Sequence, residues 1–105
     1  MINDPDRVFD ALASAPRRRI LAFLSQTALS TTDLAARFAM SAPAMSRHLA
    51  VLAAAGLVSG ERQGQRVLYR LNRDTLLDAL AGFASAVDGP LRRDALQART
   101  PREAL

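Results

Sequence analysis

The chain has 105 residues, half of them hydrophobic, so we expect one ordered domain with a modest core. Its 14 basic and 10 acidic side chains give a formal net charge of +4. The complete lack of Cys excludes disulfides, thiolate metal sites and thiol redox sensing. The longest uncharged stretches, 20–32 and 48–60, are shorter than the about 20 apolar residues of a membrane span. The acidic N-terminus differs from a secretory signal. We therefore expect a cytoplasmic protein without a membrane segment.

Two helices are predicted over the first 25 residues. One begins at Pro5, and its apolar residues share one face: Val8, Phe9 and Leu12. The other begins at Pro16 and carries an apolar stripe: Ile20, Leu21, Phe23 and Leu24. Three arginines, 17–19, follow this start, where the helix dipole does not favour cations. They are either a solvated run of charge or contacts to phosphates or to aspartates elsewhere.

A helix-turn-helix is predicted next. Ser30 is a helix N-cap followed by an acidic first turn, and Ser41-Ala42-Pro43 repeats the start signal a short distance later. The intervening Phe38-Ala39-Met40 leaves room only for a tight turn, so two short helices follow one another closely. The second of them ends before Gly56, which has the place of a C′ glycine.

Beyond Gly56 the apolar pattern changes to alternation. Residues 57–62 and 66–71 are predicted strands, joined as a hairpin across Gln63-Gly64-Gln65. Asn72 is the predicted cap of a last helix, and residues 89–105 are a charged tail for which no regular structure is predicted. The apolar stripe of the last helix is wider than a small monomer needs: Leu76, Leu80, Phe83 and Val87, flanked by Leu77 and Ala84.

The helix that begins at Ser41 carries the first functional signal. Its predicted core face holds Met45, Leu49 and Leu52. Its outward face near the N-terminus is small, polar and basic, so it can approach base edges closely. There Arg47 can pair bidentately with guanine, and Ser46 can bond a base or a phosphate. An ordinary solvated surface with one arginine would have the same pattern.

The hairpin carries the second signal. Glu61–Arg66 place two arginines and two amides around a glycine turn. Alone, this pattern also fits a soluble hairpin with routine surface charge. Directly after a helix-turn-helix it is interpreted as a wing, which lies along the phosphate backbone or places an arginine in the minor groove. Residues 41–70 carry four arginines against one acid, as a localised nucleic-acid footprint requires.

Five segments resemble the ArsR/SmtB family of bacterial winged-helix repressors, in order and across residues 5–88: Phe9–Leu21, Ser46–Leu52, Ala55–Val58, Gly64–Arg66 and Tyr69–Leu71. The resemblance implies a mainly α fold with a small β-hairpin (α+β), with about five helices and a two-stranded wing. It implies a homodimer, joined through the first and last helices, that binds a pseudo-palindromic operator in double-stranded DNA and blocks transcription. From position alone, His48 could be a half-buried side chain bonded to backbone, but the family's Ser-x-His-Leu run places it near DNA.

The expected domain is 1–88, with 89–105 as the tail. Within it, the expected DNA-binding residues lie on the outward helix face and the wing: Ser41, Pro43, Ala44, Ser46, Arg47, His48, Arg62, Gln65 and Arg66. The expected dimer interface combines the first and last helices: Val8, Phe9, Leu12, Leu76, Leu80, Phe83 and Val87.

The chain departs from the metal-sensing members of this family. They use Cys pairs on the first helix of the motif, or His with Asp or Glu on the last helix. Here Asp33–Arg37 holds no thiol, and the last helix offers Asp74 and Asp78 without a His. The single His48 cannot supply a transition-metal site. We therefore expect no metal and no cofactor.

An enzyme is not expected either, because the one His is solitary, the five glycines are scattered and no catalytic constellation has local support. Two interpretations remain beside the repressor: a nucleoid-like architectural DNA-binding protein, and a winged-helix module that docks a protein partner. The signal that would release a repressor is also open. It is a small organic molecule, a partner protein or the protein's own concentration.

Overall fold

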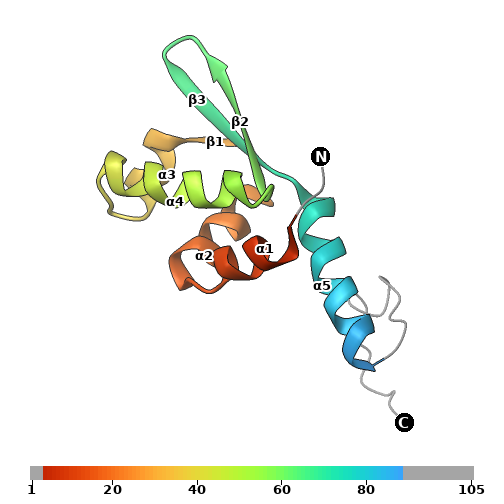
Figure 1. Ribbon diagram of the computed structural model, residues 1–105. Coiled ribbons are helices and arrows are strands. Elements are labelled where there is room, and N and C mark those ends of the chain that lie inside the picture. Colours follow the sequence, from red (N-terminus) through yellow and green to blue (C-terminus); the bar gives the residue numbers. More distant parts are fainter. Residues whose placement is uncertain (1–3, 89–105) are drawn as a thin grey trace.

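The structure of the protein, a computed structural model, describes residues 4–88, and the expected tail 89–105 lies outside the described residues. Figure 1 shows the elements, which follow one another as α1 (Pro5–Leu12), α2 (Ala15–Leu24), β1 (Leu29–Ser30), α3 (Thr31–Arg37), α4 (Ala42–Ala54), β2 (Val58–Gln63), β3 (Arg66–Leu71) and α5 (Arg73–Asp88). The predicted class, mainly α with a small sheet, is confirmed.

Capping side chains mark where four helices begin. The Asp4 carboxylate accepts from the backbone N–H of Asp6, and the hydroxyls of Ser14, Ser30 and Ser41 each accept from the N–H three residues further on. These bonds satisfy N–H groups that have no partner inside the helix. The starts predicted at Ser30 and Ser41 are thereby confirmed.

The arginines at the start of α2 cap the preceding helix. Arg17 Nε donates to the Ala11 carbonyl (2.8 Å), and Arg18 Nη1 donates to the Leu12 carbonyl (2.6 Å). Both carbonyls lie in the last turn of α1, which lacks intrahelical donors and favours positive charge. The two sequence-based interpretations, solvation and contact to phosphates or aspartates, both missed this role.

Helices α3 and α4 end in the same hydrogen-bond pattern. In each, the C′ residue and the residue after it donate back to carbonyls of the last turn, which is the Schellman motif. The C′ residue of α4 is Gly56, with φ of 77°, as predicted. In α3 it is Ala39, with φ of 53°, in the tight turn that leads to α4. A left-handed backbone costs an alanine about 1–2 kcal/mol, so this turn is strained.

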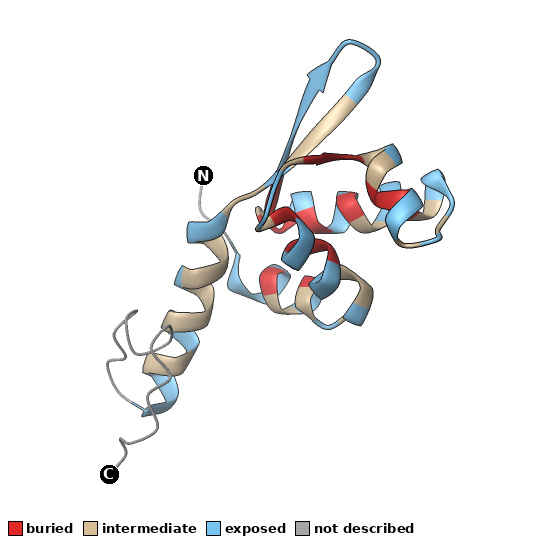
Figure 2. Ribbon diagram, turned by 180° about the vertical axis from the view of Figure 1, so that it is seen from behind, coloured by how far each residue is buried: buried red, intermediate tan, exposed pale blue. Residues whose placement is uncertain are grey.

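The core lies between α1, α2, α3 and α4, and closes against the start of β2 (Figure 2). Met45, Leu49 and Leu52 are all 0% exposed, which confirms the predicted core face of α4. Val8 of α1 belongs to the same core and is 1% exposed. Its side chain is therefore covered by its own subunit and has no surface to give to a second one. Helical spacing places a residue in an apolar stripe but does not say which edge of that stripe its own core covers.

The sheet has three antiparallel strands in the order β1-β3-β2, where the sequence predicted two. The additional strand, β1, pairs Leu29 with Tyr69 and Ser30 with Leu68. Two residues are too few to show alternation, so no strand is predicted there from the sequence. Ser30 is both the end of β1 and the cap of α3, and is 1% exposed.

Two glycines shape the hairpin of β2 and β3. Gly64 begins the turn with φ of 66° and Gln65 completes it, as in a two-residue type II′ loop. Gly60 lies opposite Tyr69, and a Cβ at this glycine would stand 2.8 Å from Tyr69 Cε1. The tyrosine ring therefore covers the backbone of the neighbouring strand.

Helix α5 leaves the body of the protein at an angle, and none of its residues is fully buried (Figures 1 and 2). Asn72 precedes it, as predicted, but the side-chain amide is used elsewhere. It donates to the Gly56 carbonyl (2.9 Å) and accepts from the Ser59 hydroxyl (3.1 Å). The side chain of Asn72 thus links the start of α5 to the start of β2 through hydrogen bonds.

Candidate nucleic-acid interface

The N-terminal half of α4 presents its predicted outward face to solvent. Ser41, Pro43, Ser46 and Arg47 are exposed, while Ala44 and His48 are half-buried. Within residues 4–88, the guanidinium of Arg47 has neither a hydrogen bond nor an ion pair. Its five N–H donors are consequently available to a partner.

Ser41 already has a structural role. Its hydroxyl oxygen accepts the backbone N–H of Ala44 at 3.2 Å and caps α4. The hydroxyl proton is still able to donate to a phosphate, because a serine both accepts and donates. The start of this helix also favours an anion through its dipole.

The wing, β2 and β3, extends beyond the helices on the side where β1 leads into α3 (Figure 1). Its tip is exposed at every position from Glu61 to Arg66. Arg62 Nη1 donates to the Gly64 carbonyl within the turn at 3.4 Å, a long bond that leaves most of the guanidinium open. Gln65 lies in the turn itself.

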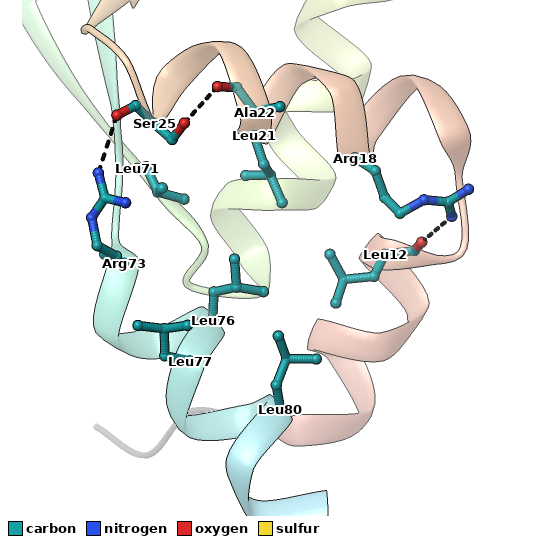
Figure 3. Close-up of a pocket in the computed structure, with 10 residues that line it drawn as sticks. All are labelled: Leu12, Arg18, Leu21, Ala22, Ser25, Leu71, Arg73, Leu76, Leu77 and Leu80. Atoms are coloured by element: carbon teal, nitrogen blue, oxygen red, sulfur yellow. Dashed lines mark hydrogen bonds between the residues drawn. The ribbon is translucent and has the colours of Figure 1, made fainter. Parts of the chain in front are cut away.

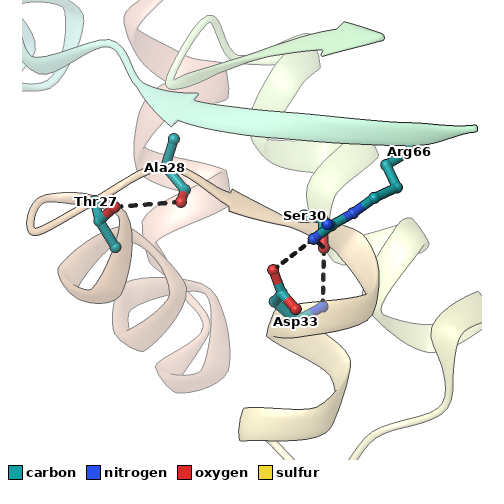
Figure 4. Close-up of polar contacts among 5 residues, drawn as sticks. All are labelled: Thr27, Ala28, Ser30, Asp33 and Arg66. Carbon is teal, nitrogen blue, oxygen red and sulfur yellow. Dashed lines mark hydrogen bonds and ion pairs between the residues drawn. The ribbon is translucent and has the colours of Figure 1, made fainter. Parts of the chain in front are cut away.

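Arg66 is exposed, but its guanidinium is bonded to other residues of the protein. Its Nη2 donates to the Ser30 hydroxyl and to the Asp33 carboxylate, both at 2.9 Å (Figure 4). The contact with Asp33 is an ion pair. The sequence predicted the residue's place on the wing but not this contact, because its partners lie more than thirty positions away in the chain.

Two arginines and two phenylalanines form a cluster between α2 and α3, which the sequence did not indicate. The rings of Phe23 and Phe38 meet edge to face, with centroids 5.5 Å apart. Arg37 lies over the Phe23 ring at 5.6 Å, and Arg19 over the Phe38 ring at 5.9 Å. These contacts hold the last turn of α3 against α2.

The expected dimer residues other than Val8 are half-buried or exposed. Phe83 is 60% exposed and Val87 70% exposed, so the far end of α5 carries large apolar side chains without cover from its own subunit. Nearer the body, an open groove of about 600 Å³ separates α5 from α1 and α2. Figure 3 shows the leucines that point into it, between Arg18 and Arg73 at its two ends. These leucines are Leu12, Leu21, Leu71, Leu76, Leu77 and Leu80.

Residues 4–88 were also compared with the requirements of a metal site and of a membrane-spanning helix. Nowhere in this range do three His, Asp or Glu side chains gather closely enough to hold a metal ion. No helix in the same range is long and apolar enough to cross a membrane.

The chain is similar to proteins of known class. A family model for a helix-turn-helix domain matches residues 7–61. Over 75 residues the chain is 36% identical to the transcriptional repressor SdpR of Bacillus subtilis, covering 71% of this chain and 83% of that protein. Over 95 residues it is 38% identical to the HTH-type transcriptional regulator Rv2034 of Mycobacterium tuberculosis, covering 80% of this chain and 89% of that protein.

A solved structure agrees with the fold. The homodimeric winged helix-turn-helix DNA-binding domain Mb0332 from Mycobacterium bovis superposes with a TM-score of 0.65 at 30% identity, covering 83% of this chain and 81% of that one. Fold and similarity together define a winged helix-turn-helix regulator of transcription, and not an enzyme. The chain belongs to the ArsR/SmtB family.

Proposed function

We propose that this protein is a homodimeric repressor that works in the cytoplasm and binds a pseudo-palindromic operator in double-stranded DNA. The observation that carries the proposal is the free guanidinium of Arg47 on the exposed face of α4, beside an exposed, cationic wing. A helix of this size fits the major groove, where an arginine reads guanine bidentately. The domain that does this is 1–88.

The proposed DNA contacts divide by role. Arg47 and Ser46 read base edges, and the small residues beside them allow α4 to approach closely. Pro43 and Ala44 are the small residues of this face, and they bond no phosphate, because Pro43 has no N–H and the N–H of Ala44 is already bonded to Ser41. The contacts to phosphates or the minor groove come from Ser41, His48, Arg62 and Gln65. Arg66 is left out of this set because its guanidinium is already bonded to Asp33 and Ser30.

The proposed dimer buries the uncovered face of α5 and the adjoining part of α1. A single subunit leaves Phe83 and Val87 mostly exposed, and exposed apolar surface of this kind marks an interface. A two-fold dimer would also carry two α4 helices, which matches an operator with two half-sites. The proposed interface residues are Phe9, Leu12, Leu76, Leu80, Phe83 and Val87.

We propose that no metal takes part. The chain has no Cys and one His, and a transition-metal site needs several soft or imidazole ligands. Operator affinity is therefore expected to be the same in chelator-treated protein and in protein supplied with zinc.

The experiment is selection of bound duplexes from random DNA, followed by fluorescence anisotropy with the selected duplex and a scrambled control at one salt concentration. A repressor of this kind is expected to prefer its site by roughly a thousandfold or more. Equal affinity for both duplexes would favour an architectural protein. The absence of salt-dependent binding to either would favour a module that docks a protein. A reporter gene placed behind the selected site then tests whether binding lowers transcription.

A further inference from the structure

Arg66, Ser30 and Asp33 form a closed set of contacts between the wing and α3. Arg66 Nη2 donates to the hydroxyl of Ser30 and the carboxylate of Asp33, and the same hydroxyl accepts the backbone N–H of Asp33 at 3.1 Å (Figure 4). One guanidinium nitrogen thus binds both the cap of α3 and its first turn.

The sheet register explains how Arg66 reaches α3. Ser30 pairs with Leu68, and Arg66 is two residues away on the same strand, so both side chains leave β3 on one face. Since β1 ends at Ser30, Arg66 lies beyond its end, where the chain turns into α3. Ser30 is 1% exposed and part of both elements, so the anchor point is rigid.

The wing has little other support. Every residue of β2 after Val58 is exposed, and a two-stranded hairpin alone is marginally stable in water. β1 pairs with β3 only at Tyr69 and Leu68. Beyond that pairing, the side chain of Arg66 supplies the hydrogen bonds that join the outer hairpin to the helices.

We propose that Arg66 is a positioning residue, which fixes the angle of the wing against the helix-turn-helix and does not itself neutralise a phosphate. This inference rests on the proposed function, because wing angle matters only to a partner that α4 and the wing touch together. Asp33 cancels the charge of Arg66, so the pair releases no counterion when DNA binds. Arg62, on the facing strand, keeps its charge uncompensated.

The variants Arg62→Ala and Arg66→Ala therefore form a matched pair, because each removes one arginine of the wing. Affinity for the selected duplex is measured by anisotropy over a series of salt concentrations. Arg62→Ala is expected to reduce the slope of log affinity against log salt by about 0.9, the value for one lost phosphate contact. Arg66→Ala is expected to weaken binding about two- to fivefold and leave the slope unchanged, because an exposed ion pair is lost and fewer molecules hold the competent wing angle.

Asp33→Ala is expected to change DNA affinity in opposite directions, depending on whether Arg66 positions the wing or binds a phosphate. If Arg66 is positioned by Asp33 and Ser30, removal of the Asp33 carboxylate weakens binding, by no more than Arg66→Ala because the bond to Ser30 remains, and the double variant is no weaker than Arg66→Ala alone. If Arg66 binds phosphate, removal of the nearby carboxylate frees its charge and tightens binding. Thermal melting of each variant checks that the fold is retained, and the salt slope is independent of a small loss of stability.

The outcomes separate the two proposals. If the wild-type protein does not discriminate its selected duplex, the proposed function fails, whatever Arg66 does. If wild type discriminates but Arg66→Ala lowers the slope as Arg62→Ala does, or Asp33→Ala tightens binding, the positioning role is wrong and the repressor stands.

Discussion

The ring of Phe9 in α1 meets the ring of Phe83 in α5 edge to face, with the centroids 5.6 Å apart. This contact joins the two helices that the proposed dimer brings together. It covers only one side of Phe83, which stays 60% exposed in the single subunit. The uncovered side is where we expect the second copy.

Replacement of Phe83 by Glu is expected to weaken dimerisation at least about tenfold, because burial of an unpaired carboxylate costs more than about 1.4 kcal/mol. Sedimentation equilibrium over a range of protein concentrations measures this effect. Ala86→Glu is the control, since Ala86 is exposed on the same helix but lies outside the apolar stripe. An unchanged dimer in Phe83→Glu would remove α5 from the proposed interface.

Replacement of Arg47 by Ala is expected to weaken binding to the selected duplex by about 1–3 kcal/mol, the contribution of a bidentate base contact. Binding to scrambled DNA should change much less, so the preference between the duplexes falls. Anisotropy with both duplexes measures the difference. Arg7→Ala on α1, another exposed arginine, serves as the control for loss of one charge. Equal losses on both duplexes would show that Arg47 reads no base.

The turn between α3 and α4 offers a stability test. Ala39→Gly is expected to raise the free energy of unfolding by about 1 kcal/mol, because glycine adopts the left-handed backbone without strain. The mirror substitution, Gly56→Ala, places an alanine in the equivalent C′ position of α4 and should lower it by about the same amount. Urea denaturation at a fixed protein concentration measures both. A destabilised Ala39→Gly variant would show that the turn is not strained.

Arg17→Ala should lower the free energy of unfolding by about 1–2 kcal/mol, because the last carbonyls of α1 lose a charged donor. The salt dependence of DNA binding should not change, since this arginine is directed at α1. Arg19→Ala is the matched control: it loses the contact with the Phe38 ring, worth about 0.5–1 kcal/mol at an exposed site. A reduced salt slope in Arg17→Ala would assign that residue to DNA instead.

Local signals in the sequence predicted most of the fold. Ser30 and Ser41 mark helix starts and Gly56 marks a helix end through chemistry that involves only the next few residues. The alternation of residues 66–71 likewise predicts β3 with its observed bounds. The outward face of α4 follows from helical spacing once its core residues are known.

What the sequence did not predict depends on contacts between distant residues. Arg17 and Arg18 reach carbonyls of a helix whose angle to their own no local pattern defines. Arg66 on β3 pairs with Asp33 in the first turn of α3, 33 positions away in the chain, and no local pattern indicates this contact. Val8 is predicted at the dimer interface because it lies in the apolar stripe of α1. Only the packing shows that its side of the stripe faces the core of its own subunit.

Tyr69 has a practical consequence. The chain contains no tryptophan and one tyrosine, so its ultraviolet emission comes almost wholly from the ring stacked over Gly60. That ring is half-buried at the base of the wing, on the same strand as Arg66. The protein therefore contains an intrinsic optical reporter, and quenching or anisotropy of this one chromophore can follow motion of the hairpin without any attached label.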